Sequence, residues 1–351
     1  MKIVLGLSGI TEEKDLVPLI EEGADEFFVG YVPKEWSDKY GFRVCPNRRP
    51  FRDYNYLSED DLVKICSLVH KFGKKIFFAL NEHEYDSDRM AMALDMLKLA
   101  ENIGFDAAIV SNLALMLEAR AKGIKIPFTL STGVGALSGE VIDFYRRHVP
   151  GITRVILPRS LTVQEIRDIV LSQKGSGLSF EVFGMSDQCP FNDEYCLAWH
   201  TEGLGAFCGF LLCSVCDISP VIKGDWKKKI MSRSREEMLS DYHASRSSIM
   251  EETGKLQASP GGYIIKDPHA SFLAFGVSIC GLCSMKLFKE WGIDAVKVPS
   301  RGDNRKRGEV IHLMRAAMKG DLNIEECQAL IGDSSFCSGR SCYYNYPFEK
   351  I

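Results

Sequence analysis

Short apolar runs recur along the first half of the chain and alternate with segments whose apolar residues return every three or four positions. The runs are Ile3–Leu7, Glu26–Gly30, Lys75–Leu80, Ala107–Val110, Phe128–Leu130, Arg154–Leu157 and Leu178–Phe183. Near-continuous apolar runs are typical of parallel strands, because helices cover both faces of such a sheet. The pattern therefore predicts seven strands of a parallel sheet.

Helix signals lie between these runs. Ser58 and Asp61 form a capping-box pattern ahead of an apolar stripe that ends before Gly73, and Thr162 with Glu165 repeats the pattern. Two more helices are expected, over Met92–Ile103 after Asp86 to Asp88, and over Val141–Arg147 with Ser138 as its cap.

The seven repeats of strand and helix favour a closed barrel over an open doubly wound sheet. An eighth strand is expected at Ala295–Val298, followed by a helix over about Arg305–Met318. The expected fold is an α/β, TIM-like (β/α)8 barrel with a long cysteine-rich insertion between strands seven and eight. The expected parts are the first seven βα units (1–184), the insertion at the barrel mouth (185–290), the last βα unit (291–320), and a C-terminal helix with a cysteine-bearing tail (321–351).

Charge and hydropathy limit the classes of partner. The chain has 351 residues and a net charge of −4, so no global positive field draws nucleic acid to it. We therefore expect a small-molecule substrate more than RNA. No apolar stretch approaches the roughly 20 residues of a membrane span, and the N-terminal run is too short for a secretory signal. The expected location is the cytoplasm.

Cysteines are concentrated in the second half of the chain, where ten of the twelve lie between Cys189 and Cys342. In a reducing compartment such a cluster indicates a metal site more than a disulfide framework. Four thiolates suit an iron–sulfur cluster, which is the leading hypothesis. Zinc stays open as the alternative, because Cys213/Cys216 and Cys280/Cys283 have the paired spacing of zinc sites. Cys66 and Cys327 lie on helical segments and are expected in the core.

Several stretches, in their order and spacing, resemble peptidase family U32, the collagenase-like peptidases. They are LIEEGADEFFVG, KFGKKIFFALN, GFDAAIVSNLAL, IPFTLST, RVILPRSLTVQEI, LSFEVFGMSDQC and CGLCSMKLFKEWGIDAVKVPSR. Branches of this family are similar to oxygen-independent hydroxylation proteins, which serve ubiquinone synthesis or hydroxylate RNA pyrimidines. The resemblance implies a four-iron [4Fe–4S] cluster on four cysteines, and prephenate as a hydroxyl donor.

The resemblance also implies the cluster ligands. Matching the family pattern position by position gives Cys189, Cys196, Cys213 and Cys280. In a related branch, a cysteine that corresponds to Cys45 and one near Cys208 replace two of these ligands. Cys196 and Cys213 belong to both versions. A second metal or a different choice stays open, because the chain also carries Cys216, Cys283, Cys337 and Cys342.

Polar residues at the expected strand ends are the catalytic candidates, since these ends form the mouth of a barrel. They are Asn81, which matches the family's strand-three asparagine, Arg159, Glu181, Lys297 and Arg301. Two arginines suit a dicarboxylate such as prephenate. The competing interpretations are a salt bridge from each arginine to a neighbouring loop, and Glu181 as the structural partner of a barrel lysine. Weaker candidates are Ser131, Thr132, His83 and, as a metal ligand, His200.

The sequence thus predicts an iron–sulfur, oxygen-independent hydroxylase-like enzyme whose acceptor is a small molecule or RNA. A hydrolase, as the family name implies, is the first alternative, although the chain has neither a G-x-S-x-G elbow nor an HExxH motif. The second alternative is a non-catalytic iron–sulfur or zinc subunit that works with a heteromeric protein partner.

Overall fold

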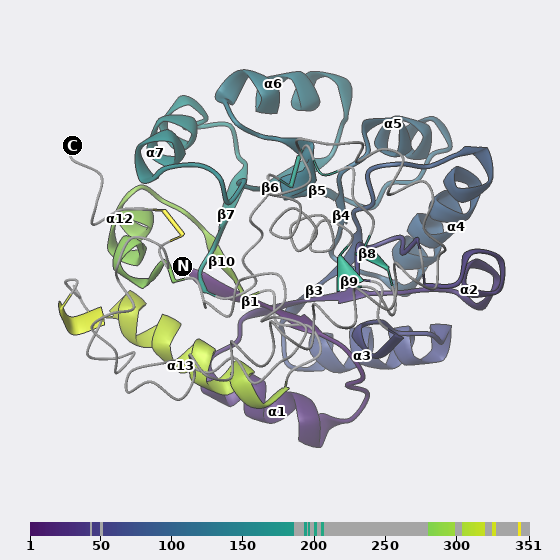
Figure 1. The fold of residues 1–351 in the computed structure, drawn as a ribbon, viewed down its shortest axis with the longest axis horizontal. Helices are drawn as coiled ribbons and strands as arrows, with labels where there is room; N and C mark the ends of the chain where they lie inside the picture. The colour runs from purple at the N-terminus through teal and green to yellow at the C-terminus, as the bar shows by residue number, and fades with distance from the viewer. Residues whose placement is uncertain are drawn as a thin grey trace, which may run out of the picture.

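Eight parallel strands close into a barrel in the computed structural model (Figure 1). The structure describes residues 1–42, 44–49, 52–185, 193–194, 196, 200–201, 205–206, 280–298, 304–319, 325–327 and 343–344. Around the barrel the strands follow the order β1-β10-β7-β6-β5-β4-β3-β2. They are β1 (Lys2–Leu7), β2 (Glu26–Gly30), β3 (Lys75–Leu80), β4 (Ala107–Val110), β5 (Phe128–Leu130), β6 (Ile152–Ile156), β7 (Ser179–Phe183) and β10 (Ala295–Val298). The predicted TIM-like barrel is confirmed.

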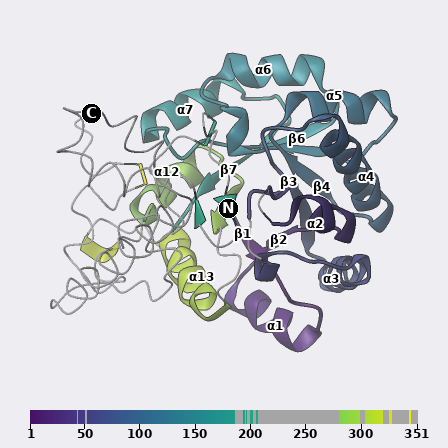
Figure 2. The same ribbon diagram turned by 45° about the vertical axis from the view of Figure 1, so that its right-hand side comes forward.

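Helices form the outer ring around these strands (Figures 1 and 2). They are α1 (Glu13–Glu22), α2 (Lys34–Tyr40), α3 (Glu59–Lys71), α4 (Ser87–Ile103), α5 (Leu113–Ala121), α6 (Gly139–His148), α7 (Val163–Ser172), α12 (Met285–Glu290) and α13 (Asn304–Lys319). Their apolar stripes pack on the sheet, which explains why the strands are buried at nearly every position. Among the described residues, no helix is both long enough and apolar enough to span a membrane.

The predicted bounds of β2, β3, β4, β5 and β10 agree with the observed ones. β1 starts one residue earlier than predicted and β7 one residue later, and β6 differs more. β6 starts at Ile152, two residues before the predicted start, because Ile152 pairs with Phe128 and a register shift follows Phe128. Thr153 also donates its hydroxyl to the Phe128 carbonyl oxygen. Pairing with β5 therefore extends the strand to Ile152 and the polar Thr153, ahead of the predicted run.

Side-chain caps fix most of the predicted helix starts. Thr162 and Glu165 form a complete capping box at α7, and the Ser58 side chain accepts the Asp61 N–H at α3. Asp86 caps α4, which consequently begins at Ser87 rather than near Met92. Ser138 holds the predicted N-cap position of α6, but its side chain makes no capping hydrogen bond. Its hydroxyl instead hydrogen-bonds Glu140.

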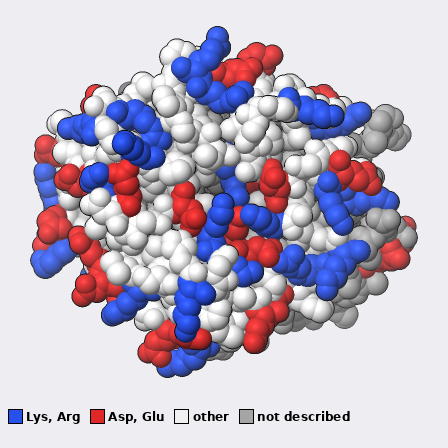
Figure 3. All heavy atoms as spheres, turned by 180° about the vertical axis from the view of Figure 1, so that it is seen from behind, with Lys and Arg blue, Asp and Glu red and all other residues white. Residues whose placement is uncertain are grey.

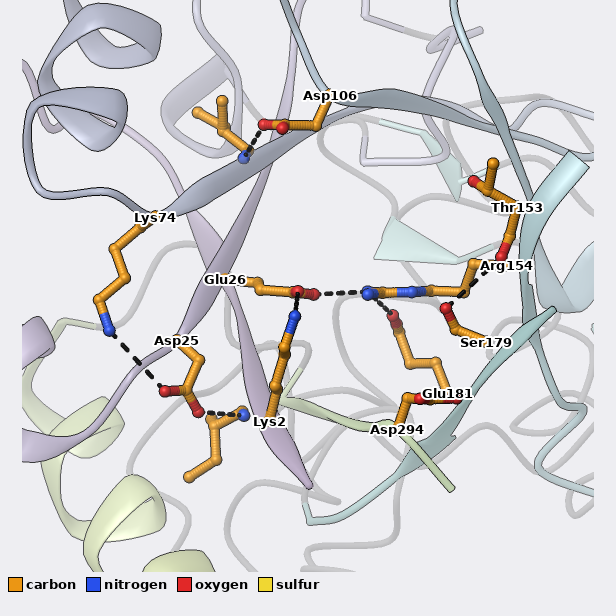
Figure 4. Close-up of polar contacts among 12 residues, drawn as sticks. Lys2, Asp25, Glu26, Lys74, Asp106, Thr153, Arg154, Ser179, Glu181 and Asp294 are labelled. Atoms are coloured by element: carbon orange, nitrogen blue, oxygen red, sulfur yellow. Dashed lines mark hydrogen bonds and ion pairs between the residues drawn. The ribbon is translucent and has the colours of Figure 1, made fainter. Parts of the chain in front are cut away.

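A Gly-x-Asp sequence recurs in three connections between a helix and the next strand, at residues 23–25, 104–106 and 292–294. Each glycine has a positive φ, of 117°, 97° and 83°, which a residue without Cβ adopts most easily. Each aspartate then accepts a backbone N–H of the neighbouring strand. The donors are Ile3 (2.9 Å), Ile76 (2.8 Å) and Phe180 (2.8 Å). One short motif thus ends a helix and fixes the next strand beside its neighbour, and Figure 4 shows the contacts of Asp25 and Asp106.

The two ends of the insertion after β7 lie next to each other at the barrel. Met185 and Cys280 form an antiparallel bridge, and the Gly281 N–H donates to the Gly184 carbonyl oxygen at 2.9 Å. A two-stranded pair, β8 (His200–Thr201) and β9 (Gly205–Ala206), is described within the insertion. Helix α12 also lies inside the expected range 185–290, so the barrel resumes before residue 291.

Candidate functional site

A chain of buried ion pairs fills part of the barrel interior (Figure 4). Arg154 Nη1 lies 2.6 Å from Glu26 Oε2 and 3.1 Å from Glu181 Oε2, and Lys297 Nζ lies 2.9 Å from Glu181 Oε1. The half-exposed Lys2 reaches the other oxygen of Glu26 at 2.7 Å. Burial alone would raise the pKa of Glu26, but the hydrogen bond and charge of Arg154, helped by Lys2, lower that pKa below its usual value.

Both oxygens of Glu181 are therefore engaged by cations. The alternative interpretation of Glu181, as the structural partner of a barrel lysine, matches the observed contact with Lys297. The Lys297 ammonium also lies 3.9 Å from the centroid of the Phe28 ring. These contacts hold the ammonium group in one position on β10.

Arg159 follows β6 and is held in place by two contacts. Its Nε donates to Asp193 Oδ2 at 2.8 Å, and its guanidinium lies 4.4 Å from the centroid of the Phe183 ring. Asp193 belongs to the insertion, so the salt bridge to a neighbouring loop is present. Arg301, the other predicted arginine, lies outside the described residues.

Asn81, Ser111 and Ser131 come together where β3, β4 and β5 end. Asn81 Nδ2 lies 3.5 Å from Ser131 Oγ, and the Ser111 hydroxyl donates to the Asn81 carbonyl oxygen at 3.1 Å. Asn81 Oδ1 is buried, and within the described part of the chain it has no hydrogen-bond partner. This oxygen is consequently available to accept a hydrogen bond from a ligand.

His83 fits closely against Gly133. A Cβ atom at position 133 would lie 2.2 Å from His83 Cε1, so a side chain there would displace the ring. Burial first, and the charge of Arg48 second, lower the pKa of His83 to about 4. The imidazole is therefore neutral at neutral pH, and its buried Nε2 has no hydrogen-bond partner among the described residues.

The described cysteines differ in how their sulfur atoms are hydrogen-bonded. Cys196 Sγ accepts from Arg48 Nη2 at 2.9 Å, and Cys280 Sγ accepts from the Leu282 N–H at 3.4 Å. Cys45 Sγ donates to the Arg49 carbonyl oxygen at 2.9 Å, and it also accepts from Asn55 Nδ2 at 3.9 Å. Cys45 thus has an acceptor that requires the thiol hydrogen, whereas Cys196 and Cys280 each accept a hydrogen bond from an N–H group.

These surroundings fit the expected cluster ligands as far as the structure reaches. Hydrogen bonds to cysteine sulfur are a usual feature of iron–sulfur sites. Within the described ranges, no group of three or more His, Cys, Asp or Glu side chains is arranged to hold a metal ion. A four-cysteine set therefore needs ligands from elsewhere in the chain. Outside the described residues lie Cys189, Cys208, Cys213, Cys216, Cys337 and Cys342, and so does the side chain of His200.

Arg48 and Glu82 are site residues that the sequence did not reveal. Arg48 Nη1 lies 3.7 Å from Glu82 Oε1, and burial raises the pKa of Glu82. The local signal for Arg48 was the basic pair Arg48 and Arg49, three and four positions after Cys45 in the stretch VCPNRRP. Glu82 follows β3 by two positions, and charged residues that follow a strand closely are candidates for the mouth of a barrel.

Two curated relatives match about half of the chain. The tRNA hydroxylation protein P2 of Bacillus subtilis (strain 168) is 25% identical over 184 residues, which are 52% of this chain and 53% of that protein. The tRNA hydroxylation protein P of Escherichia coli (strain K12) is 26% identical over 175 residues, which are 50% of this chain and 34% of that protein. The chain thus aligns with about half of the first relative and a third of the second.

Solved structures are more distant. The U32 peptidase Mk0906 has a TM-score of 0.39 at 12% identity, over 55% of this chain and 75% of that one. DHDPS from Cyanidioschyzon merolae has a TM-score of 0.34 at 11% identity, over 92% of this chain and 99% of that one. The sequence pattern of the family described as Peptidase family U32 matches residues 12–204, more than half of the chain. The chain therefore belongs to peptidase family U32.

Proposed function

We propose that this protein is an oxygen-independent, hydroxylase-like enzyme that acts on tRNA. The observation that carries the proposal is the pair of curated relatives, since both are named tRNA hydroxylation proteins and both match about half of this chain. Family membership and the polar strand ends of the barrel agree with it.

The proposed acceptor differs from the small molecule that the net charge favoured. Charges of both signs are interspersed on the face opposite the view of Figure 1, as Figure 3 shows, so that face offers no broad basic area. The sequence of the insertion, in contrast, contains a strongly basic segment. Residues 223–235, KGDWKKKIMSRSR, carry six Lys and Arg against one Asp. A local basic segment can hold phosphates although the whole chain is acidic.

The proposed cofactor is a [4Fe–4S] cluster on Cys189, Cys196, Cys213 and Cys280, and zinc is the alternative. When bound, the cluster supplies redox chemistry that side chains lack. In the proposed reaction the donor's hydroxyl group is exchanged for a hydrogen of the acceptor base, so atoms and electrons balance without an external oxidant. Prephenate is the proposed donor.

The residues of the barrel would bind and orient these reactants. Arg159 and Arg301 would bind the donor's carboxylates, with the donor competing against Asp193 for Arg159. Lys297, held by Glu181, would add a positive charge at the end of β10. Asn81 Oδ1 would accept a hydrogen bond from a ligand at the ends of β3 to β5.

The test combines metal analysis with RNA analysis. The protein is purified without oxygen, and iron, acid-labile sulfide and zinc are measured per chain. The protein is then incubated with prephenate and with tRNA from a strain that lacks this protein. The nucleosides of the tRNA are analysed by mass spectrometry. We expect iron and sulfide in equal amounts and a pyrimidine heavier by one oxygen atom. Unchanged nucleosides from protein that holds its cluster would contradict the tRNA hydroxylase, and zinc without iron would contradict the cluster.

A further inference from the structure

The backbone of Arg48 is in an unusual conformation. Its φ is 57°, and among the described residues it is the only non-glycine residue with a positive φ. Such a conformation persists where surrounding contacts impose it, and it is common at functional sites. The Arg48 N–H donates to the Cys45 carbonyl oxygen at 3.2 Å, which closes a tight turn in the loop after β2.

The turn carries the Arg48 guanidinium into a buried position between two segments. Nη2 lies 2.9 Å from Sγ of Cys196, which belongs to the insertion. Nη1 lies 3.7 Å from Oε1 of Glu82, which follows β3. The Arg48 side chain is 13% exposed and that of Glu82 is 5% exposed, so solvent screens these contacts little.

A guanidinium has only donors, and it keeps its charge at every pH at which proteins fold. A sulfur ligand that accepts a hydrogen bond from it has part of its negative charge offset by the fixed cation. Glu82 reduces the net charge of the pair and orients the planar group. The arrangement is that of a cation held beside one particular sulfur atom.

We infer that Arg48 is a positioning residue that raises the reduction potential of the metal centre through its hydrogen bond to Cys196. The inference rests on the proposed cluster and deepens it. One-electron reduction makes the cluster more negative, and a donated hydrogen bond and a nearby cation stabilise that state. Loss of the guanidinium consequently lowers the potential. Loss of the Glu82 charge has the opposite effect, because the charge of Arg48 is then uncompensated.

The experiment measures metal content and potential on anaerobically purified full-length protein. The variants are Arg48→Gln, Arg48→Lys and Glu82→Gln, and the matched control is Arg146→Gln on the outer helix α6. Iron and sulfide per chain are measured first, and the reduced fraction is then followed by electron paramagnetic resonance during a dye-mediated redox titration. Thermal melts confirm that each variant is folded.

In Arg48→Gln we expect the ratio of reduced to oxidised cluster, at the wild-type midpoint, to fall about tenfold, which corresponds to about 59 mV for one electron. Arg48→Lys should show a smaller fall, since it keeps the charge without the planar fork, and Glu82→Gln should show a rise. Arg146→Gln should not change. If Arg48→Gln loses its iron, Arg48→Lys and Glu82→Gln still show in which direction the reduction potential changes.

The two possible failures are distinguishable. Wild-type protein without iron would overturn the proposed cluster and, with it, the role of Arg48. Wild-type protein with its cluster, and with potentials unchanged in the Arg48 and Glu82 variants, would overturn the role of Arg48 alone.

Discussion

The ammonium group of Lys297 lies 2.9 Å from Oε1 of Glu181, and the two side chains are buried inside the barrel on the neighbouring strands β10 and β7. The second oxygen of the same carboxylate lies 3.1 Å from Nη1 of Arg154. One carboxylate thus compensates two buried cations. Buried charges of this kind are tolerated only while their partners are present.

Replacement of Glu181 by glutamine tests this dependence. The variant removes the Glu181 charge beside Lys297 and leaves Arg154 with the carboxylate of Glu26, and we expect it to lower the free energy of unfolding by about 3–5 kcal/mol. Urea unfolding followed by circular dichroism measures the change. Glu12→Gln removes an exposed carboxylate that pairs with Lys14, and it should leave the transition where it is. Equal unfolding midpoints for wild type and Glu181→Gln would show that the ion pairs add no stability.

Glu26 should give the protein a specific sensitivity to acid. Its pKa is lowered in the folded state, mainly because Arg154 offsets the cost of burial. The stability that follows from this shift is fully present above the unfolded pKa of about 4.3, and it is lost as the pH falls through the lower folded pKa. We therefore expect the wild-type free energy of unfolding to fall more steeply below about pH 4 than that of Glu26→Gln. Urea titrations at a series of pH values compare the two slopes, and parallel slopes would contradict the prediction.

His83 should stay neutral in the folded protein throughout the physiological range, because its pKa is lowered to about 4. A lowered histidine pKa stabilises the fold above the unfolded value of about 6.5, and this stability falls as the pH drops from there. Nuclear magnetic resonance of the Cε1–H proton, assigned with His83→Gln, follows the titration. In Gly133→Ala the new methyl group displaces the ring, so we expect the His83 pKa to rise toward its ordinary value. A midpoint near 6.5 in the wild type would contradict the buried position of the ring.

The sequence predicted the barrel because each strand is buried on both faces and each helix carries a local stop or start signal. Thr162 with Glu165 encodes the start of α7 within four residues. Ser138 is the N-cap residue of α6, but its side chain hydrogen-bonds Glu140 and makes no capping hydrogen bond. A local sequence pattern does not show whether the side chain of a capping residue will hydrogen-bond a neighbouring side chain instead of the backbone.

The candidate site was predicted where side chains lie on strands or directly after them. The sequence indicated Glu181 as the structural partner of an unspecified barrel lysine, and the structure identifies that lysine as Lys297. The contact of Arg48 with Cys196 joins residues 148 positions apart, and nothing in either local sequence encodes it. Such a pairing emerges only once the barrel has brought the loop after β2 and the insertion together.

Substitutions of the cysteines test the proposed ligand set. Cys196→Ala, Cys213→Ala and Cys280→Ala each remove a proposed ligand, and we expect all three variants to lose iron. Cys66→Ala should keep its iron. Burial, with a smaller effect of Asp106, raises the pKa of the Cys66 thiol to about 12, so this sulfur is not a thiolate at neutral pH. Iron and sulfide per chain measure the outcome.

Cys45 provides the sharper comparison, because the family resemblance offered it as an alternative ligand. In this structure the Cys45 thiol donates to the Arg49 carbonyl oxygen, and a serine hydroxyl can make the same hydrogen bond. We therefore expect Cys45→Ser to retain its iron and Cys280→Ala to lose it, when both are purified without oxygen and compared by iron content and visible spectrum. If Cys45→Ser instead loses iron and Cys280→Ala keeps it, Cys45 replaces Cys280 in the ligand set. Arg48, which hydrogen-bonds Cys196 and lies three positions after Cys45, would then be close to two ligands of the cluster.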